Sequence, residues 1–217
     1  MARQKKASTT PAAPRPRRRA RTRYHHGDLR RALLDAARAV VAKDGVDAVR
    51  LSALATRLRV SVAAPFRHFA SKDALLVALA EEGAARMVAA MTAAAAAAAD
   101  PLEAERARGV AYVRFVVSEP GYFRVLARKE ILAQSQELAQ LASSQQALME
   151  AVLGRDHAGA NSRALVQRSA GLLAAQALTY GLARMVDDGI LGDVDPDAAA
   201  ALAVEVTDVL GRGLLPR

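Results

Sequence analysis

Apolar residues recur at steps of three and four along most of this 217-residue chain, the spacing that places them on one face of an α-helix. The first such pattern predicts a helix that begins near Asp28, whose carboxylate can accept hydrogen bonds from the free N–H groups of a helix start. Gly45 predicts its end, because glycine favours the backbone turn that closes a helix. The apolar face comprises Leu29, Leu33, Ala36, Ala37, Val40 and Val41.

A pair of short helical patterns joined by a tight turn comes next. The first spans about 51–58 and the second about 62–68, and the Ser61 hydroxyl is placed to cap the second. Pro65 lies in the first turn of the second pattern, one position late, so we expect one backbone hydrogen bond to be missing. The apolar positions expected to form a small core beneath this pair are Leu51, Leu54, Ala55, Leu58, Val60 and Phe69.

A longer pattern leads from this pair into the rest of the chain. Ser71 can cap it, and Ala93–Ala99 can extend it until Asp100-Pro101 breaks it, because alanine is the strongest helix former. Its apolar stripe comprises Leu75, Leu76 and Leu79. Pro and Gly breaks further on predict helices near 102–118, 121–130, 133–153, 161–189 and 196–211. We find neither a β-hairpin pattern nor a repeat, and therefore predict an all-α protein.

Charge is distributed unevenly along the chain, whose net charge is +9. Residues 1–23 hold nine Lys or Arg and no acid, residues 24–80 carry a net +4, and residues 81–217 carry a net −4. The tail has almost no large apolar side chains, so we expect it to be disordered. A positive end on a mildly negative body suits a protein that meets a polyanion at that end. The alternative is a tail that only keeps the chain soluble.

Several kinds of site are absent from the sequence. There is no Cys, which excludes disulfides and fits a reducing compartment, and the four His lack metal-ligand spacing, so we expect no metal or other cofactor. No phosphate-binding glycine loop or nucleophile elbow predicts an enzyme. A calcium site is conceivable among Asp187, Asp188, Asp193, Asp195 and Asp197, but it lacks a closing Glu, and helix capping by Asp195 is expected instead. Without a span or signal pattern, we expect a cytoplasmic protein.

The short helical pair is typical of DNA-binding proteins, because such a pair can place its second helix in the major groove while the first braces it. Val62, Ala63 and Ala64 offer only apolar contact, for example to thymine methyl groups, whereas Arg67 could bind a guanine edge or a phosphate. Lys72 is placed to bind backbone phosphate. For any one of these cations, a solvated surface is the alternative. The candidate DNA-binding residues are Arg17, Arg18, Arg19, Arg21, Arg23, Tyr24, His26, Arg50, Arg59, Ser61, Val62, Ala63, Ala64, Phe66, Arg67, His68 and Lys72.

This region resembles the TetR family of transcriptional regulators, of the TetR/AcrR type. The resemblance covers about residues 24–80 and rests on Tyr24-His25-His26-Gly27-Asp28-Leu29, Gly45, Leu54-Ala55, Leu58, Val60-Ser61, Pro65-Phe66-Arg67-His68-Phe69, and Lys72 with Leu75-Leu76. It implies three N-terminal helices for DNA and a larger helical domain for an inducer and for homodimerisation. Three positions depart from the family. Arg59 replaces the glycine of the turn, Arg50 replaces a Ser/Thr cap, and Phe66 replaces a tyrosine whose hydroxyl would contact phosphate.

The C-terminal part resembles a subgroup of that family characterised by a Trp-His-Gly motif. Residues 112–124 resemble its Pro-centred corner, and residues 176–183 resemble the motif itself, with Gln176 and Tyr180 in the Trp and His places. The resemblance implies an inducer cavity between helices, and for the aromatic candidates core packing is the alternative. The candidate ligand-binding residues are Arg114, Phe115, Phe123, Gln176 and Tyr180. The helices near 161–189 and 196–211 are the implied dimer interface, although an intramolecular packing face fits their sequences as well.

These observations predict three parts: a disordered basic tail (1–23), a helix-turn-helix DNA-binding domain (24–80) and a helical regulatory and dimerisation domain (81–217). We expect a ligand-responsive repressor that binds a pseudo-palindromic operator as a homodimer and is released by a small-molecule inducer. One alternative is a sequence-tolerant architectural DNA-binding protein that uses the tail and head. The other is a small-molecule-binding or enzymatic helical domain with a vestigial head.

Overall fold

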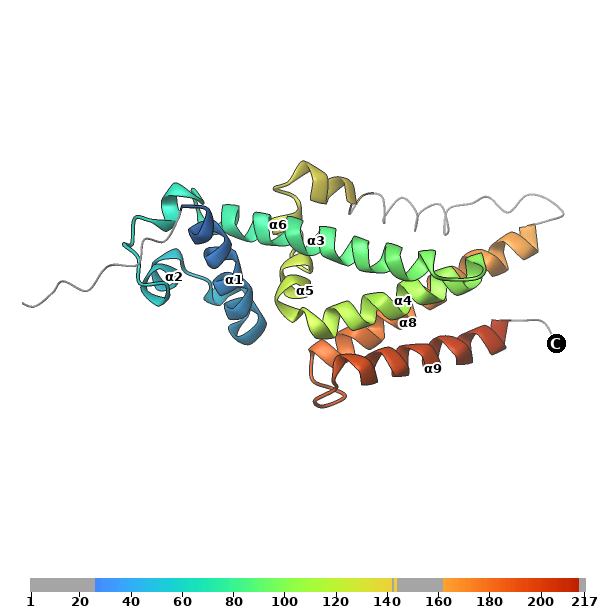
Figure 1. Cartoon of the computed structure of the whole chain (residues 1–217). Coiled ribbons are helices and arrows are strands. Elements are labelled where there is room, and N and C mark those ends of the chain that lie inside the picture. Colours follow the sequence, from blue (N-terminus) through green and yellow to red (C-terminus); the bar gives the residue numbers. More distant parts are fainter. Residues whose placement is uncertain (1–25, 142, 144–161, 215–217) are drawn as a thin grey trace, which may run out of the picture.

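A computed structural model of the chain describes residues 26–141, 143 and 162–214, which are mainly helical and contain no strand. Figure 1 shows an elongated molecule with a small head at one end and a body of longer helices at the other. The head comprises α1 (His26–Asp44), the 3₁₀ turn η1 (Val46–Ala48), α2 (Leu51–Arg57) and the 3₁₀ turn η2 (Pro65–Arg67). The body comprises α3 (Lys72–Ala96), α4 (Pro101–Ser118), α5 (Pro120–Leu126), α6 (Lys129–Leu132), α8 (Ser162–Asp187) and α9 (Pro196–Leu214).

The predicted first helix is confirmed as α1, which begins two residues earlier than expected. Gly45 ends it with φ of 83°, and the Gly45 N–H donates to the Val41 carbonyl at 3.1 Å. The expected apolar face is buried apart from Val40, which is half-buried, and Leu34 joins it in the core. This wide apolar face is needed because α1 packs against both α5 and α3.

The helix predicted to follow Ser71 is confirmed as α3, and it connects the head to the body (Figure 1). The Ser71 hydroxyl oxygen accepts a hydrogen bond from the Ala74 N–H at 3.0 Å, so the cap forms as expected. The alanine run extends the helix to Ala96. An Asp100 carboxylate oxygen then accepts from the Glu103 N–H at 2.9 Å, at the start of α4.

In the body, α4 packs against α3, α8 and α9. A second apolar cluster lies between α4, α5, α8 and α9 and consists of Val113, Val116, Phe123, Leu182, Ala183, Ala199 and Ala203. The predicted cap of the last helix is confirmed, since one Asp195 carboxylate oxygen accepts from the N–H groups of Asp197 and Ala198, both at 2.9 Å. No described helix is both long and apolar enough to cross a lipid bilayer.

The single helix predicted over 121–130 is wrong, because the chain breaks between α5 and α6. The backbone of Arg128 is extended there, and its guanidinium donates to an Asp47 carboxylate oxygen of the head at 2.6 Å. No Gly or Pro marks this break in the sequence. The helix predicted over 133–153 is present at 136–141, and its remainder lies largely outside the described residues.

Candidate nucleic-acid interface

The segment after α2 is not the helix that the sequence predicts over 62–68. It consists of turns that end in the short η2, where the Ala64 N–H donates to the Ser61 carbonyl at 2.9 Å and the Arg67 N–H donates to the Ala64 carbonyl at 3.2 Å. Pro65 has no N–H to donate four residues back to Ser61, so the first α-helical hydrogen bond is lost and three-residue turns replace it. The predicted Ser61 side-chain cap is also wrong, since Ala64 precedes η2 and no side chain caps it.

The turn after α2 holds Arg59, a residue other than glycine, in a left-handed backbone conformation. Its φ is +57°, which makes it the only non-glycine residue with positive φ in the described part of the chain. The Val60 N–H donates to the Ala55 carbonyl at 3.0 Å and the Arg59 N–H donates to the Thr56 carbonyl at 3.1 Å. This pair of bonds is the Schellman motif that ends helices, with Arg59 in the left-handed position that glycine usually holds.

We expect Arg59→Gly to raise the free energy of unfolding by about 1 kcal/mol, because glycine removes a left-handed strain of that order while loosening the unfolded chain slightly. Urea denaturation of both proteins would measure the change. The matched control is Arg57→Gly, which removes the same side chain from the last turn of α2 and should destabilise by about 0.5–1 kcal/mol. Equal shifts of the two variants in one direction would contradict a special backbone at Arg59.

The outer surface of the head combines apolar and basic side chains. Val62 and Phe66 are 58% and 53% exposed, and Ser61, Ala63 and Arg67 are exposed between and beside them. Arg50 and Arg59 are exposed as well, whereas Ala64 and His68 are half-buried. The structure therefore places most of the described candidates on the surface of one short segment, with Ala64 packed against the core of the head instead.

The core beneath this surface agrees with the sequence. Leu51, Leu54, Ala55 and Phe69 are buried, and Leu58 and Val60 are half-buried. The Arg30 guanidinium lies 5.3 Å from the centre of the Phe69 ring, a cation–π contact that covers the ring. The Lys72 ammonium donates to the Asp47 carbonyl at 3.3 Å, and Lys72 stays half-buried at the start of α3.

Some candidates cannot be placed. Arg17, Arg18, Arg19, Arg21, Arg23 and Tyr24 lie outside the described residues, together with the rest of the predicted tail. His26 is the first residue of α1, but its side chain is also outside the described part. Their DNA-binding roles remain predictions.

The head contacts the body mainly where α1 packs against α5 and α3, and Tyr122 of α5 is fully buried in that region. Its hydroxyl donates to a Glu82 carboxylate oxygen at 2.7 Å. The guanidinium groups of Arg38 and Arg86 each lie 5.4 Å from the centre of the Tyr122 ring. Gly83 permits this approach, because a Cβ there would lie 2.8 Å from the Tyr122 Cβ. Tyr122 is thus a buried aromatic side chain at the contact that positions the head.

Glu82 accepts several hydrogen bonds at the same contact. One of its oxygens accepts from the Arg31 guanidinium at 2.7 Å and from the Arg86 guanidinium at 3.0 Å, in addition to the Tyr122 hydroxyl. Burial by itself raises the pKa of Glu82, but the bonds from Arg31 and Tyr122 outweigh it and hold the pKa below its usual range. Arg31 also lowers the pKa of Asp35, whereas burial and the Glu82 bond raise the pKa of Tyr122.

Arg124 ties three helices together. Its guanidinium donates to the Ala42 carbonyl of α1 at 2.7 Å and to an Asp187 carboxylate oxygen at the end of α8 at 3.0 Å. The Asp187 side chain is only 6% exposed, and Arg184 pairs with it at 3.5 Å. Sequence reasoning missed the contacts of Glu82 and Arg124 and considered Asp187 only as a conceivable calcium ligand, because charged residues on amphipathic helices give no signal of their long-range partners.

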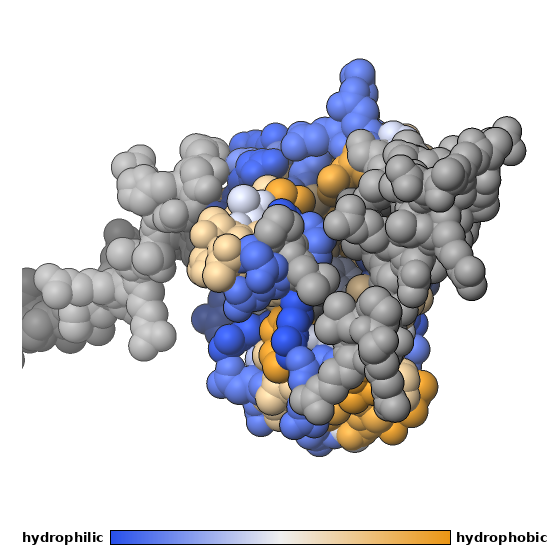
Figure 2. Space-filling view, turned by 90° about the vertical axis from the view of Figure 1, so that its right-hand side faces the viewer, coloured by the Kyte–Doolittle hydropathy of each residue, from blue (hydrophilic) through white to orange (hydrophobic). Residues whose placement is uncertain are grey.

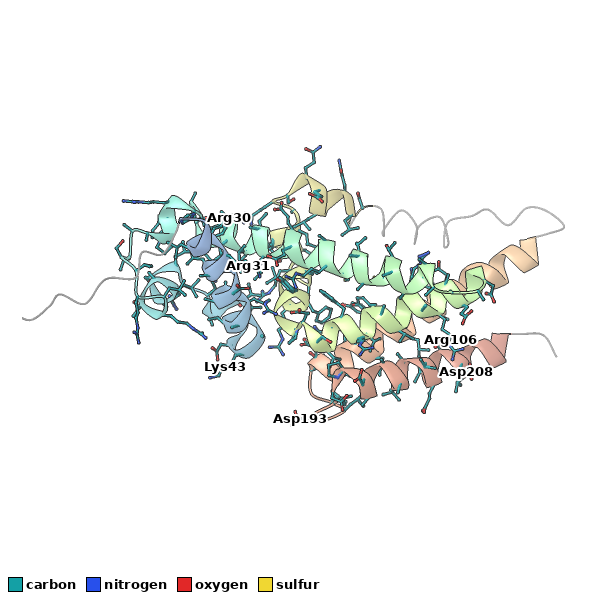
Figure 3. The ribbon with its side chains drawn as sticks, viewed as in Figure 1. Arg30, Arg31, Lys43, Arg106, Asp193 and Asp208 are labelled. Atoms are coloured by element: carbon teal, nitrogen blue, oxygen red, sulfur yellow. The ribbon has the colours of Figure 1, made fainter. Side chains whose placement is uncertain are left out.

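A groove of about 740 Å³ lies on α4 between α3 and α9. Its lining includes Val110 and Phe115, and both of its guanidinium groups are paired with α9, Arg114 with Asp197 and Arg106 with Asp208 at 2.9 Å. Figure 3 shows Arg106 and Asp208 facing each other between the two helices.

Two of the five candidate ligand-binding residues, Arg114 and Phe115, line this groove. Phe123 is buried elsewhere, with its ring centre 6.5 Å from that of Tyr112. Gln176 is half-buried and Tyr180 is 55% exposed, both on α8. The structure therefore does not gather the five residues at one site, and their ligand-binding role remains a prediction.

Comparison with known proteins identifies the fold of both parts. Residues 33–79 match the family described as bacterial regulatory proteins, tetR family. No curated protein matches the chain significantly. The chain therefore has a TetR-like helix-turn-helix head, and its helical C-terminal domain matches the solved structures of TetR regulators.

Three similar solved structures illustrate this fold. A protein of unknown function from Rhodococcus sp. RHA1 is 29% identical, with 90% of this chain and 100% of that one covered and a TM-score of 0.62. PfmR, a TetR family transcriptional regulator from Thermus thermophilus, is 23% identical, with 85% and 99% covered and a TM-score of 0.59. A TetR-like transcriptional regulator from Rhodococcus sp. RHA1 is 21% identical, with 86% and 96% covered and a TM-score of 0.58.

Proposed function

We propose that this chain is a transcriptional repressor of the TetR family that binds a pseudo-palindromic DNA operator as a homodimer and leaves it when a small-molecule inducer binds. The proposal rests chiefly on the sequence and the surface of the head. Its match to the tetR family covers residues 33–79, and it exposes Val62, Phe66 and Arg67 on the segment that a helix-turn-helix offers to DNA. The basic tail would add phosphate contacts and a steep salt dependence.

The outer faces of α8 and α9 support a homodimer. α8 exposes Tyr180 and Met185, and α9 exposes Ala201 and Val209, the last at 73%. A Cβ added to Gly181 would meet nothing within 4 Å, which leaves room for a helix of a second copy. Figure 2 shows apolar residues grouped at the lower right of the molecule, the level at which α9 runs in Figure 1. Such faces suit an isologous contact between two copies.

Release by an inducer requires that the ligand bind one arrangement of the dimer more tightly than the other. α3 lines the groove through Ala90 and Ala94 and begins beside the head, so movement of its far end would tilt residues 61–67, the reading segment. Arg124 provides a second connection, from the end of α8 to α1. Membership of the Trp-His-Gly subgroup is also part of this proposal, and it rests on the sequence alone.

Selection of bound fragments from random-sequence DNA, with the full chain at fixed salt, tests the proposal. We expect a sequence with two-fold symmetry to be enriched and to bind at least about 10³-fold more tightly than bulk DNA. Arg67→Ala should weaken binding by about 1–3 kcal/mol and relax one base pair if Arg67 contacts a base. The matched control is Arg108→Ala, an exposed-helix arginine of the body, which should leave DNA binding unchanged.

Two other outcomes would favour the alternatives. If the chain bound the best fragment no more tightly than bulk DNA, it would be a sequence-tolerant architectural protein. Ligand binding that is unaffected by DNA would contradict an inducer-controlled regulator, because linkage between two ligands is reciprocal.

A further inference from the structure

The reading segment carries an apolar tip, which we define as Val62, Ala63 and Phe66. Val62 and Phe66 are 58% and 53% exposed, and Ala63 is exposed between them. They are the two large apolar side chains that the described part of the head leaves to solvent. Exposed apolar side chains concentrated on one short segment indicate a candidate interaction surface.

The surroundings of the apolar tip fit a polyanion. Residues 48–72 contain five Arg or Lys and no acidic residue. Arg59 and Arg67, which flank the tip in sequence, are both exposed. DNA offers phosphates on both sides of its major groove, which arginines on either side of an apolar tip can contact. The charge pattern therefore favours DNA as the partner of the tip.

The chemistry of the tip limits what it can recognise in DNA. Val62, Ala63 and Phe66 have no side-chain donor or acceptor, and hydrogen bonding on this surface is left to Ser61 and Arg67. In the major groove, the apolar feature that distinguishes one base pair from another is the 5-methyl group of thymine. An apolar tip gains free energy from that methyl group and none from the polar base edges.

The tip is also held in place well enough to distinguish thymine from other bases. Pro65 between its members is buried, the turns from Ser61 to Arg67 are closed by backbone hydrogen bonds, and the branched Val62 side chain has few rotamers. We infer that the head reads its operator chiefly through thymine 5-methyl groups, which Val62 and Phe66 contact. This inference rests on the proposed function and specifies how that function obtains its sequence preference.

Replacing thymine by deoxyuracil in the selected operator tests the inference, because it removes only the methyl group and leaves every phosphate and hydrogen bond in place. Dissociation constants would be measured by fluorescence anisotropy with the full chain at fixed salt, one symmetric pair of positions at a time. Burial of one methyl group corresponds to about a fourfold change in affinity, so a symmetric pair contacted by two copies should change it by about 15-fold. We expect this loss at one or two pairs of positions.

Variants of the tip assign the loss to its side chains. Val62→Ala and Phe66→Ala should weaken binding to thymine operators and abolish the penalty of deoxyuracil at the contacted position. Both side chains are exposed, so the fold should be unaffected, which circular dichroism would verify. The control Val88→Ala, at an exposed valine of α3, should keep the full penalty.

The outcomes distinguish failure of this inference from failure of the proposed function on which it rests. If deoxyuracil left the affinity for the selected operator unchanged at every position, the inference would be wrong and the proposed function would stand. The same holds for a penalty that persists in both tip variants. A chain that selects no sequence would overturn both.

Discussion

Tyr122→Ala is expected to lower the free energy of unfolding by about 4 kcal/mol, the largest effect of any single side chain at the contact between head and body. Tyr122 is fully buried, its ring centre lies 6.5 Å from that of Phe115, and Arg38 and Arg86 lie over it. Truncation would leave a cavity and would also remove a donor from Glu82. Urea denaturation at neutral pH would measure the loss.

Tyr122→Phe is the matched control. It keeps the ring and removes only the hydroxyl, so it should cost about 1 kcal/mol, because Glu82 retains its bonds to Arg31 and Arg86. A loss in Tyr122→Ala no larger than that in Tyr122→Phe would show that the ring contributes little and that the head is held by other contacts.

Asp187→Ala is expected to cost about 2–3 kcal/mol, because it leaves the half-buried Arg124 guanidinium without its carboxylate partner. The Asp187 side chain is 6% exposed and also pairs with Arg184. Since Arg124 also holds the Ala42 carbonyl of α1, operator affinity should fall as well, through a looser head. Thermal unfolding and DNA binding of the same preparation would measure both effects.

The neighbouring residue supplies the control for that prediction. Asp188 pairs with Arg184 at 2.7 Å, but its side chain is 45% exposed, so Asp188→Ala should change stability by less than about 0.5 kcal/mol. If the two variants lost equal stability, the cost would come from the end of α8 in general and not from the connection to Arg124.

Much of the fold could be predicted because it depends on local pattern. The apolar faces of α1, α2 and α3 are buried as their spacing indicates, and the Ser71 and Asp195 caps form as expected. Arg59 stands out in the sequence because the family resemblance places glycine at that position of the turn, and its φ of +57° shows that the backbone there is left-handed. These features depend on residues within about one helical turn of each other.

The errors arose where local rules competed. Pro65 lies one position too late in its turn, and the loss of its hydrogen bond converted a predicted helix into 3₁₀ turns. The break at Arg128 has no Gly or Pro to mark it, and it places the guanidinium against Asp47 of the head. In the first case the sequence contains the signal, which is Pro65, and in the second the break accompanies a tertiary contact.

The sequence by itself determined where most of the helices lie, which of their faces are apolar, and that positive charge is concentrated at the N-terminal end. Only the tertiary structure decided which faces meet, because Glu82 and Tyr122 are 40 residues apart and Arg38 and Glu119 are 81 apart, separations at which helical periodicity carries no information. It likewise decided that Val62 and Phe66 face solvent while Ala64 packs inward, since that division depends on how the turns around Pro65 lie on the core of the head.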